Sequence, residues 1–454
     1  MKAIKRLYML PVLLICAAGL IAAQDKETTE VLTVDRAVEL AMQNNIQLAS
    51  TAIDVRIKKR SKDYAWNVFI PGVQATGTLA RSNNASNPYA GILKMINPMY
   101  TEPDAQEKDH WNVMAGLNLS LNLNLALVQG FRATRQNYEA GLLSYEQARQ
   151  ETEGNVKKAF YGILLQEGSL DVSRDKLEIS IDRLNQTRIN YKNGLVPELA
   201  YLQTQLAVET QKPVIMEAEL NLEQQKNMFA FLLGLPIETK ISLDGEIEPN
   251  PQYFNADELV NKHLGNRLDL AILQKNQALL ETQLKATQLQ RFTPSIALSQ
   301  SFAPRLSAID DSWLKTKNWD DSSGAFSLTI AFNLTNMLPF SSIGVNAAET
   351  RDNLEKISMG FNQMVYQAEL EIRNLVKKLD KANAAIKAMD LNVEMAQKAY
   401  NLTEQGYRAG TIEYLDLKDS ENTLVQARLG VLSEKFNYLS ALLDLEKALN
   451  TKLR

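Results

Sequence analysis

The chain has 454 residues, 45% of them hydrophobic, and a formal net charge of −4. A charge this small argues against a nucleic-acid partner, and a single cysteine, Cys16, excludes an internal disulfide framework. A chain of this length ordinarily forms two or three domains. No stretch rich in Pro, Gly and Ser divides it, so the composition favours one continuous body.

The N-terminus has the pattern of a secretory signal peptide. Basic residues precede an apolar run of about 15 residues, and Ala22-Ala23 offer a small-residue cleavage site. The run is shorter than the roughly 20 residues that cross a bilayer, so we expect residues 1–23 to be removed after export. Lipidation at Cys16 is the alternative, but Ile15 stands where lipoprotein signals carry Gly, Ala or Ser. No other segment is long and apolar enough for a transmembrane helix.

Four later segments alternate apolar and polar residues with the period of a β-strand. In the clearest, residues 117–125, every odd position is Leu and every even position is Asn or Ser; residues 326–334 are its counterpart. Two weaker strands follow the Phe-x-Pro sequences that begin at Phe69 and Phe292. A soluble β-sandwich also alternates. Here the polar face is uncharged and each strand has about 9–11 residues. Both features favour strands that cross a bilayer and line a water-filled lumen over a soluble sandwich.

Aromatic residues gather at the ends of these strands, as in the interfacial girdles of membrane barrels. They are Trp66, Phe69, Trp111, Phe292, Phe326 and Phe340. Polar segments over 82–109 and 304–321 join the two strands of each pair. Because outer-membrane strands carry long loops on their outer side, we expect both segments outside the membrane.

The rest of the sequence has the pattern of long helices. Residues 130–191 and 342–407 contain no proline, and each stretch would extend roughly 90–100 Å at 1.5 Å per residue. A second helix is expected after each, over 197–233 and 412–449. Apolar residues in the last helix recur every seven positions, which is typical of a coiled coil. They are Leu424, Val431, Tyr438 and Leu445.

The two halves of the chain repeat these landmarks in the same order. The two Phe-x-Pro sequences lie 223 residues apart, and Tyr191-x-x-Gly194 lies 216 residues before Tyr407-x-x-Gly410. We therefore predict two structural repeats, 24–236 and 237–454, each with two strands and one long helical hairpin. The second repeat would begin with a segment, 237–255, that links the halves around the outside.

Four strands per chain are too few to close a membrane barrel. Unpaired backbone groups at an open edge cost several kcal/mol each in hydrocarbon. Eight strands already fill their interior with side chains, so two chains would give a plugged barrel, whereas three would give twelve strands and a bore. The sequence thus predicts a cyclic homotrimer that is in contact with outer-membrane lipid.

Taken together, these marks resemble the TolC family of outer-membrane efflux ducts. They are the Phe-x-Pro strand openings, the Leu-Leu-Gly-Leu-Pro helix end at 232–236, the two Tyr-x-x-Gly sequences, and the Asn-rich strand before Gly130. The resemblance implies an α+β membrane protein. Its trimeric 12-stranded transmembrane β-barrel would continue into a long periplasmic α-helical coiled-coil barrel.

The resemblance also implies a function and partners. The protein would be the passive outer-membrane exit duct of a tripartite efflux or type I secretion system. An inner-membrane RND or ABC pump would energise it through a periplasmic adaptor (membrane fusion) protein. The exported substrate cannot be read from the sequence, because ducts for drugs, metals, siderophores and proteins share this pattern.

Two acidic residues fall where the family places rings of carboxylates at the inner constriction. Asp416 and Asp419 stand at i and i+3, on one face of a helix. Three copies would set six carboxylates around the pore, where they would bind cations and raise one another's pKa values. The alternative is that both are early-helix acids favoured by the helix dipole.

The tip also departs from the family pattern. Ile412 replaces a gate-locking arginine, Ala200 stands at its acidic partner position, and Lys418 separates the two acids. The resemblance therefore implies a tip held shut differently, by apolar contact or by Tyr191 and Tyr407. Adaptor contacts are expected at the tip residues over 194–198 and 411–413, which begin at Gly194 and follow Gly410.

Nothing in the sequence indicates an enzyme or a cofactor site. His110 and His263 are the only histidines and lack metal-ligand spacing, so both are expected to be ordinary surface residues. A general diffusion porin and a structural periplasmic coiled coil are the two alternatives to the duct.

Overall fold

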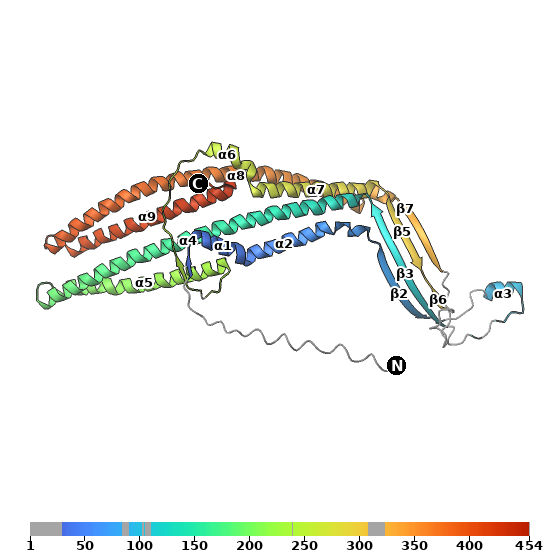
Figure 1. Cartoon of the computed structure of the whole chain (residues 1–454), viewed down its shortest axis with the longest axis horizontal. Helices are drawn as coiled ribbons and strands as arrows, with labels where there is room; N and C mark the ends of the chain where they lie inside the picture. Colours follow the sequence, from blue (N-terminus) through green and yellow to red (C-terminus); the bar gives the residue numbers. More distant parts are fainter. Residues whose placement is uncertain are drawn as a thin grey trace. The chain divides into compact units, whose positions relative to one another are not determined.

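The computed structural model describes residues 30–83, 90–101, 104, 110–237, 239–306 and 323–453 (Figure 1). The expected signal peptide with Cys16, part of the first expected outer loop and most of the second lie outside these residues. The rest groups into two compact units, each built from pieces of both halves. Arg149–Glu258 and Ile372–Arg454, with the N-terminal segment up to Ala49, form the helical unit; Ser50–Ala148 and Leu259–Glu371 form the sheet unit.

Long helices dominate the chain, as predicted. Helices α4 (Ala126–Lys192) and α8 (Ser342–Arg408) have 67 residues each, and both contribute to the two units. Helices α5 (Glu198–Leu233) and α9 (Tyr414–Leu449) have 36 residues each. The matching lengths confirm the internal duplication. Within the described residues, no helix is long and apolar enough to span a membrane.

The ends of the paired helices are also alike. Gly194 and Gly410 follow α4 and α8 with φ of 71° and 75°. Gly234 (φ 73°) follows α5, and Asn450 (φ 52°), 216 positions later, follows α9. These left-handed residues close helix ends because their N–H groups bond back to carbonyls of the last turn. The structure therefore places one turn geometry at four equivalent positions.

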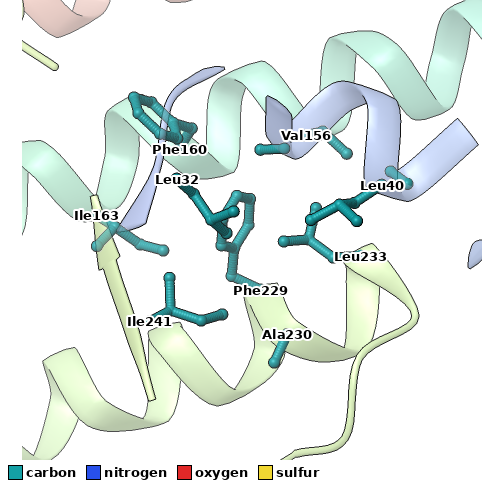
Figure 2. Close-up of a cluster of buried hydrophobic side chains, with 11 residues drawn as sticks. Leu32, Leu40, Val156, Phe160, Ile163, Phe229, Ala230, Leu233 and Ile241 are labelled. Atoms are coloured by element: carbon teal, nitrogen blue, oxygen red, sulfur yellow. The ribbon is translucent and has the colours of Figure 1, made fainter. Parts of the chain in front are cut away.

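The helical unit has its core where the two ends of the first repeat meet (Figure 2). Strands β1 (Glu30–Leu32) and β4 (Ile241–Leu243) pair in parallel beside helix α1 (Val34–Asn44). Phe160 of α4 and Phe229 of α5 belong to this core, and their ring centroids are 6.4 Å apart. The other buried members are Leu32, Ala37, Leu40, Ala41, Val156, Ile163, Ala230, Leu233 and Ile241. The β1–β4 pair was not predicted, because three-residue strands carry too short a pattern.

The segment expected to link the halves packs against α9. The Tyr438 hydroxyl accepts a hydrogen bond from the backbone N–H of Gln252 (2.8 Å) and donates one to the carbonyl of Asn250 (3.3 Å). Tyr438 itself is fully buried. The segment is followed by α6 (Ala256–His263), within which the chain passes from the helical unit to the sheet unit.

The sheet unit holds the predicted strands. They are β2 (Gly72–Arg81), β3 (Trp111–Asn124), β5 (Ser295–Phe302) and β7 (Gly324–Ala331). All neighbours are antiparallel in the order β2-β3-β5-β7, and a two-residue strand, β6 (Arg305–Leu306), pairs with β3. This order leaves β2 and β7 at the edges. Helices α2 (Ile46–Asp63) and α7 (Leu268–Phe292) lead into β2 and β5.

The two faces of the sheet differ sharply in chemistry. The register aligns Val73 with Leu119, Leu121 with Leu298 and Leu298 with Leu328 on one face. Many of these side chains are exposed in the single chain; they include Val73, Leu79, Leu117, Ile296, Phe302, Phe326, Leu328 and Ile330. The other face carries uncharged polar groups, and the hydroxyls of Ser299 and Ser327 lie 2.8 Å apart on it. An exposed apolar face opposite a polar face is the pattern of strands between lipid and an aqueous lumen.

The start of α7 contains a charged cluster that makes stability depend on pH. Arg267 donates to both carboxylate oxygens of Asp269 (3.0 and 2.7 Å) and lies 2.8 Å from Glu371. Burial alone would raise the pKa of Asp269, but hydrogen bonds from Arg267 and from the Leu270 N–H lower it overall. A carboxyl with a lowered pKa stabilises the folded state above its ordinary pKa, and that contribution is lost as the pH falls through the lowered value.

Asp269→Asn is therefore expected to destabilise the protein at pH 7 by about 1–2 kcal/mol. The difference from the parent should begin to shrink once the pH falls below the ordinary pKa of an aspartate, about 3.9. It should vanish below the lowered pKa of Asp269, since the parent carboxyl is then protonated in both the folded and the unfolded state. Thermal unfolding followed by circular dichroism at several pH values measures it. Asp257→Asn is the control, because the ion pair of Asp257 with Arg373 is exposed. An equal loss at every pH would contradict the assignment.

Candidate functional site at the hairpin tips

Each long hairpin turns at the predicted Tyr-x-x-Gly sequence (Figure 1). In the first tip, the N–H of Gly194 bonds to the carbonyl of Tyr191, and the N–H of Leu195 to that of Asn190, both at 2.9 Å. In the second tip, Gly410 bonds to Tyr407 at 3.0 Å and Thr411 to Gly406 at 2.9 Å. Only glycine adopts the required positive φ without a steric cost. The two tips are therefore structural copies.

The tip tyrosines contact residues of their own hairpins. Tyr191 stacks on Tyr201 of α5, with ring centroids 5.5 Å apart and an interplanar angle of 5°. The ring centroids of Tyr407 and of Tyr414 in α9 are 6.2 Å apart. These pairs fasten the end of each long helix to the start of the next. Whether Tyr191 and Tyr407 also hold the duct shut stays a prediction.

Ile412 packs back onto its own helix end. A Cβ atom added to Gly406 would lie 2.5 Å from Ile412 Cδ1, so the glycine makes room for this side chain. Ala200 lies half-buried in the first turn of α5. Leu195, by contrast, is 72% exposed, and Gly194, Gly410, Thr411 and Glu413 are exposed as well. The outward groups of the tips thus include the residues expected to meet an adaptor.

Asp416 and Asp419 stand in the first two turns of α9 and are both exposed. Lys418 between them is exposed too. Leu417, on the opposite side of this turn, is fully buried against Tyr400, Leu424 and Ala396. The helix orientation is therefore fixed by an apolar contact, and the two carboxylates point away from it. Their role at a constriction stays a prediction, because it requires neighbouring copies.

A buried ion pair near the tips was not anticipated from the sequence. Arg183 of α4 donates a hydrogen bond from Nη1 to Oε2 of Glu421 of α9 at 2.8 Å. Their side chains are only 11% and 7% exposed. Nearby, Lys176 Nζ donates to Asn422 Oδ1 at 2.9 Å. These contacts join the first hairpin to the second, and we call the Arg183–Glu421 pair the hairpin clamp.

The surroundings of the hairpin clamp are aromatic and poorly hydrated. Burial would lower the pKa of Arg183, but the hydrogen bond and charge of Glu421 raise it overall, so the guanidinium stays charged. Burial raises the pKa of Tyr400 and of Tyr414. Both hydroxyls also interact electrostatically with the charges of Arg183 and Glu421. The second carboxylate oxygen of Glu421, Oε1, is buried without a hydrogen-bond partner among the described residues. Such a site holds its charges only while both partners are present.

Polar contacts fix the order of helices in the helical unit as α8-α9-α4-α5. Arg428 of α9 donates to Gln397 of α8 at 2.7 Å, and the hairpin clamp joins α9 to α4. Lys226 of α5 lies 2.7 Å from Glu167 of α4. Helices α8 and α5 are therefore the outer members of this layer.

The sheet unit has an equivalent order, α2-α4-α7-α8. Lys62 of α2 lies over the Tyr138 ring of α4 at 4.5 Å. Lys275 of α7 pairs with Glu139 of α4 at 2.8 Å, and Arg267, which precedes α7, pairs with Glu371 of α8. Here α2 and α8 are the outer helices.

A comparison with known families decides what this arrangement belongs to. The sequence model of the family described as "Outer membrane efflux protein" matches residues 37–235 and again residues 259–451. The chain belongs to the outer membrane efflux protein family. The double match agrees with the duplication, and it decides for the TolC-type duct over the porin and the structural coiled coil.

Curated relatives and solved structures agree with this assignment. TolC of Escherichia coli is 22% identical over 74% of this chain and 69% of its own length. The alkaline protease secretion protein AprF of Pseudomonas aeruginosa is 21% identical over 71% and 67%. Among solved structures, VceC of Vibrio cholerae superposes with a TM-score of 0.72 at 18% identity, over 93% of this chain and 97% of VceC. CmeC of Campylobacter jejuni gives 0.74 at 16% identity, over 92% and 85%.

This efflux channel is thus a non-enzymatic transport protein of the bacterial outer membrane. Within the described residues, no group of three or more His, Cys, Asp or Glu side chains is placed to hold a metal ion. His110 has a structural contact instead: its Nδ1 lies 2.9 Å from the carbonyl of Ser82, at the outer end of the β2–β3 hairpin.

Proposed function

We propose that the protein is the passive exit duct of a tripartite efflux or type I secretion system. It works as a homotrimer, with a periplasmic adaptor at its tips and an inner-membrane RND or ABC pump as the energy source. The observation that carries the trimer is that, in the part of the chain that the structure describes, the sheet and both layers of helices end in an edge without a partner on each side. The family to which the chain belongs supports the same assembly.

The sheet supplies the first pair of edges. Among the described residues, strands β2 and β7 each pair on one side only. An open backbone edge in hydrocarbon is too costly to persist. Pairing β7 of one copy with β2 of the next removes both edges. Two copies would close eight strands, which side chains fill, whereas three copies close twelve around an aqueous bore.

The outer helices supply matching edges. Helix α8 exposes Leu391, Met395 and Leu402 in the helical unit, at intervals of four and seven residues. On the other side of that unit, α5 exposes Leu199, Leu202 and Leu206. In the sheet unit, Ile53 and Ile57 of α2 and Tyr64 just after it are similarly exposed. So are Met359, Tyr366 and Leu370 of α8. Apolar stripes at helical spacing bury against a partner helix, and a cyclic neighbour provides one on each side.

Cross-linking across the seam tests this assembly. Leu199 and Leu402 lie near the two tips on opposite outer helices, so a chain carrying Leu199→Cys and Leu402→Cys should cross-link to both neighbours with a flexible bis-maleimide. A ladder that ends at three subunits, in fractions that float with outer membranes, is the expected result. Each single variant alone should give no ladder. Species beyond three, or monomers only, would contradict the trimer.

At the mouth of the assembled duct, Asp416 and Asp419 from three copies form the proposed acidic constriction. Their exposure leaves both carboxylates available to passing cations. The exposed tip residues Leu195, Thr411 and Glu413 form the proposed adaptor contact. Loss of co-purification with the cognate adaptor after Leu195→Asp, with trimer formation intact, tests that contact separately.

A further inference from the structure

A short helix between β2 and β3 presents an apolar face. Helix α3 (Ala90–Ile96) begins nine positions after the last residue of β2, Arg81. The most exposed apolar side chains on and just after it are Ile92 (56%), Met95 (86%), Ile96 (77%) and Met99 (91%). Their spacing of i, i+3, i+4 and i+7 places them on one side of the helix, and Lys94 falls on the opposite side.

This face is held by local hydrogen bonds. The N–H of Asn97 bonds to the carbonyl of Leu93 at 2.8 Å, which continues the helical turn past Ile96. The Asn97 side chain accepts a bond from the Met99 N–H at 3.1 Å, and the Tyr100 N–H bonds to the Asn97 carbonyl at 2.9 Å. Met99 therefore follows α3 in a defined turn.

The loop that carries α3 leaves the sheet at the end of the sheet's apolar face. The base of this loop is closed by the Ser82 N–H, which bonds to the His110 carbonyl at 2.7 Å, and by the His110 ring on the Ser82 carbonyl. Just inside this base, Leu79 is aligned with Val113 on the apolar face of the sheet. The apolar side chains of α3 thus lie close, along the chain, to the outer limit of the lipid-facing band.

We propose that α3 lies on the outer surface of the outer membrane with Ile92, Met95, Ile96 and Met99 among the lipids. Amphipathic helices bind membranes by burying their apolar face at the boundary of headgroups and acyl chains. Turned inward, the same face would meet the uncharged polar side of the strands and water. Turned outward, it continues the apolar face of the sheet, and Lys94 remains in water. Each of the chains that form the duct would then have its own anchor on the outer leaflet.

Fluorescence quenching by lipid tests the proposal on the complete mature duct, reconstituted after removal of the signal peptide that carries Cys16. Met95→Cys and Lys94→Cys are labelled separately with an environment-sensitive dye and placed in phosphatidylcholine–phosphatidylglycerol vesicles with and without doxyl-labelled phosphatidylcholine. Contact with acyl chains should remove roughly half of the Met95→Cys signal and little of the Lys94→Cys signal. Because both positions are exposed, neither variant should disturb folding, and unchanged single-channel conductance verifies this.

Two outcomes would overturn the proposal. Equal, weak quenching at both positions with a spectrum typical of water would place α3 in solvent. A blue-shifted but unquenched dye at Met95→Cys would place the face against protein, either in the lumen or on a second copy. Met99→Cys repeats the measurement at a second position on the same face and should match Met95→Cys.

Discussion

Arg183→Met is expected to open the resting duct and to destabilise it. The substitution keeps most of the side-chain volume. It removes the guanidinium that lies 2.8 Å from the buried carboxylate of Glu421 and so leaves that charge unpaired. Removing one member of a buried ion pair typically costs about 3–5 kcal/mol. Since the pair joins α4 to α9, its loss should separate the two hairpins near their tips, and resting conductance in planar bilayers should rise.

Two further variants distinguish the pair from its surroundings. Arg183→Met combined with Glu421→Met replaces both charges with apolar volume and should recover most of the stability, because no buried charge remains. Lys176→Met removes a neighbouring contact to Asn422 between the same helices and should have a much smaller effect. If the double variant were as unstable as Arg183→Met, packing rather than the unpaired charge would explain the loss.

The second large effect is expected from the acidic pair at the start of α9. Asp416→Ala combined with Asp419→Ala removes six negative charges from the mouth of a trimer. Carboxylates attract a passing cation strongly where the pore is narrow and poorly hydrated. The potassium-to-chloride permeability ratio from single-channel reversal potentials should therefore fall toward one, and block by divalent cations should weaken by about tenfold or more.

A matched loss of charge elsewhere is the control for this experiment. Glu209→Ala with Glu394→Ala also removes two acids per chain, from exposed positions on α5 and α8 farther from the tips. Selectivity should stay close to that of the parent in this variant. Unchanged selectivity after loss of Asp416 and Asp419 would exclude the ring and leave both residues as early-helix acids favoured by the dipole.

The sequence predicted those parts of the molecule whose signals are local and repeated. The alternation over 117–125, the proline-free stretches and the Tyr-x-x-Gly turns each depend on neighbouring residues, and the structure has strands, long helices and tips there. The duplication helped further, because Gly194 and Gly410 support the same interpretation twice. Asp416 and Asp419 could be placed on one helix face, although their assembly into a ring remains a prediction.

The hairpin clamp could not be predicted in this way. Arg183 and Glu421 are 238 positions apart, and each stands on a helix where most charged residues are solvated. Only the packing of α4 against α9 makes these two buried. The parallel pair β1–β4 was missed for a related reason: three residues on each side form a ladder only because Leu32 and Ile241 meet the core around Phe160. Long-range packing, not local pattern, decides such contacts.

The equal lengths of the paired helices restrict how this family of sequences can change. An insertion of one turn in α4 alone would move its tip by about 5.4 Å relative to the other and shift the hairpin clamp out of register. To preserve both, the same number of residues must be added to α4, α5, α8 and α9. Natural variants of different length should therefore carry insertions of equal size in all four helices. The two halves of the gene would then have continued to change length together long after they were duplicated.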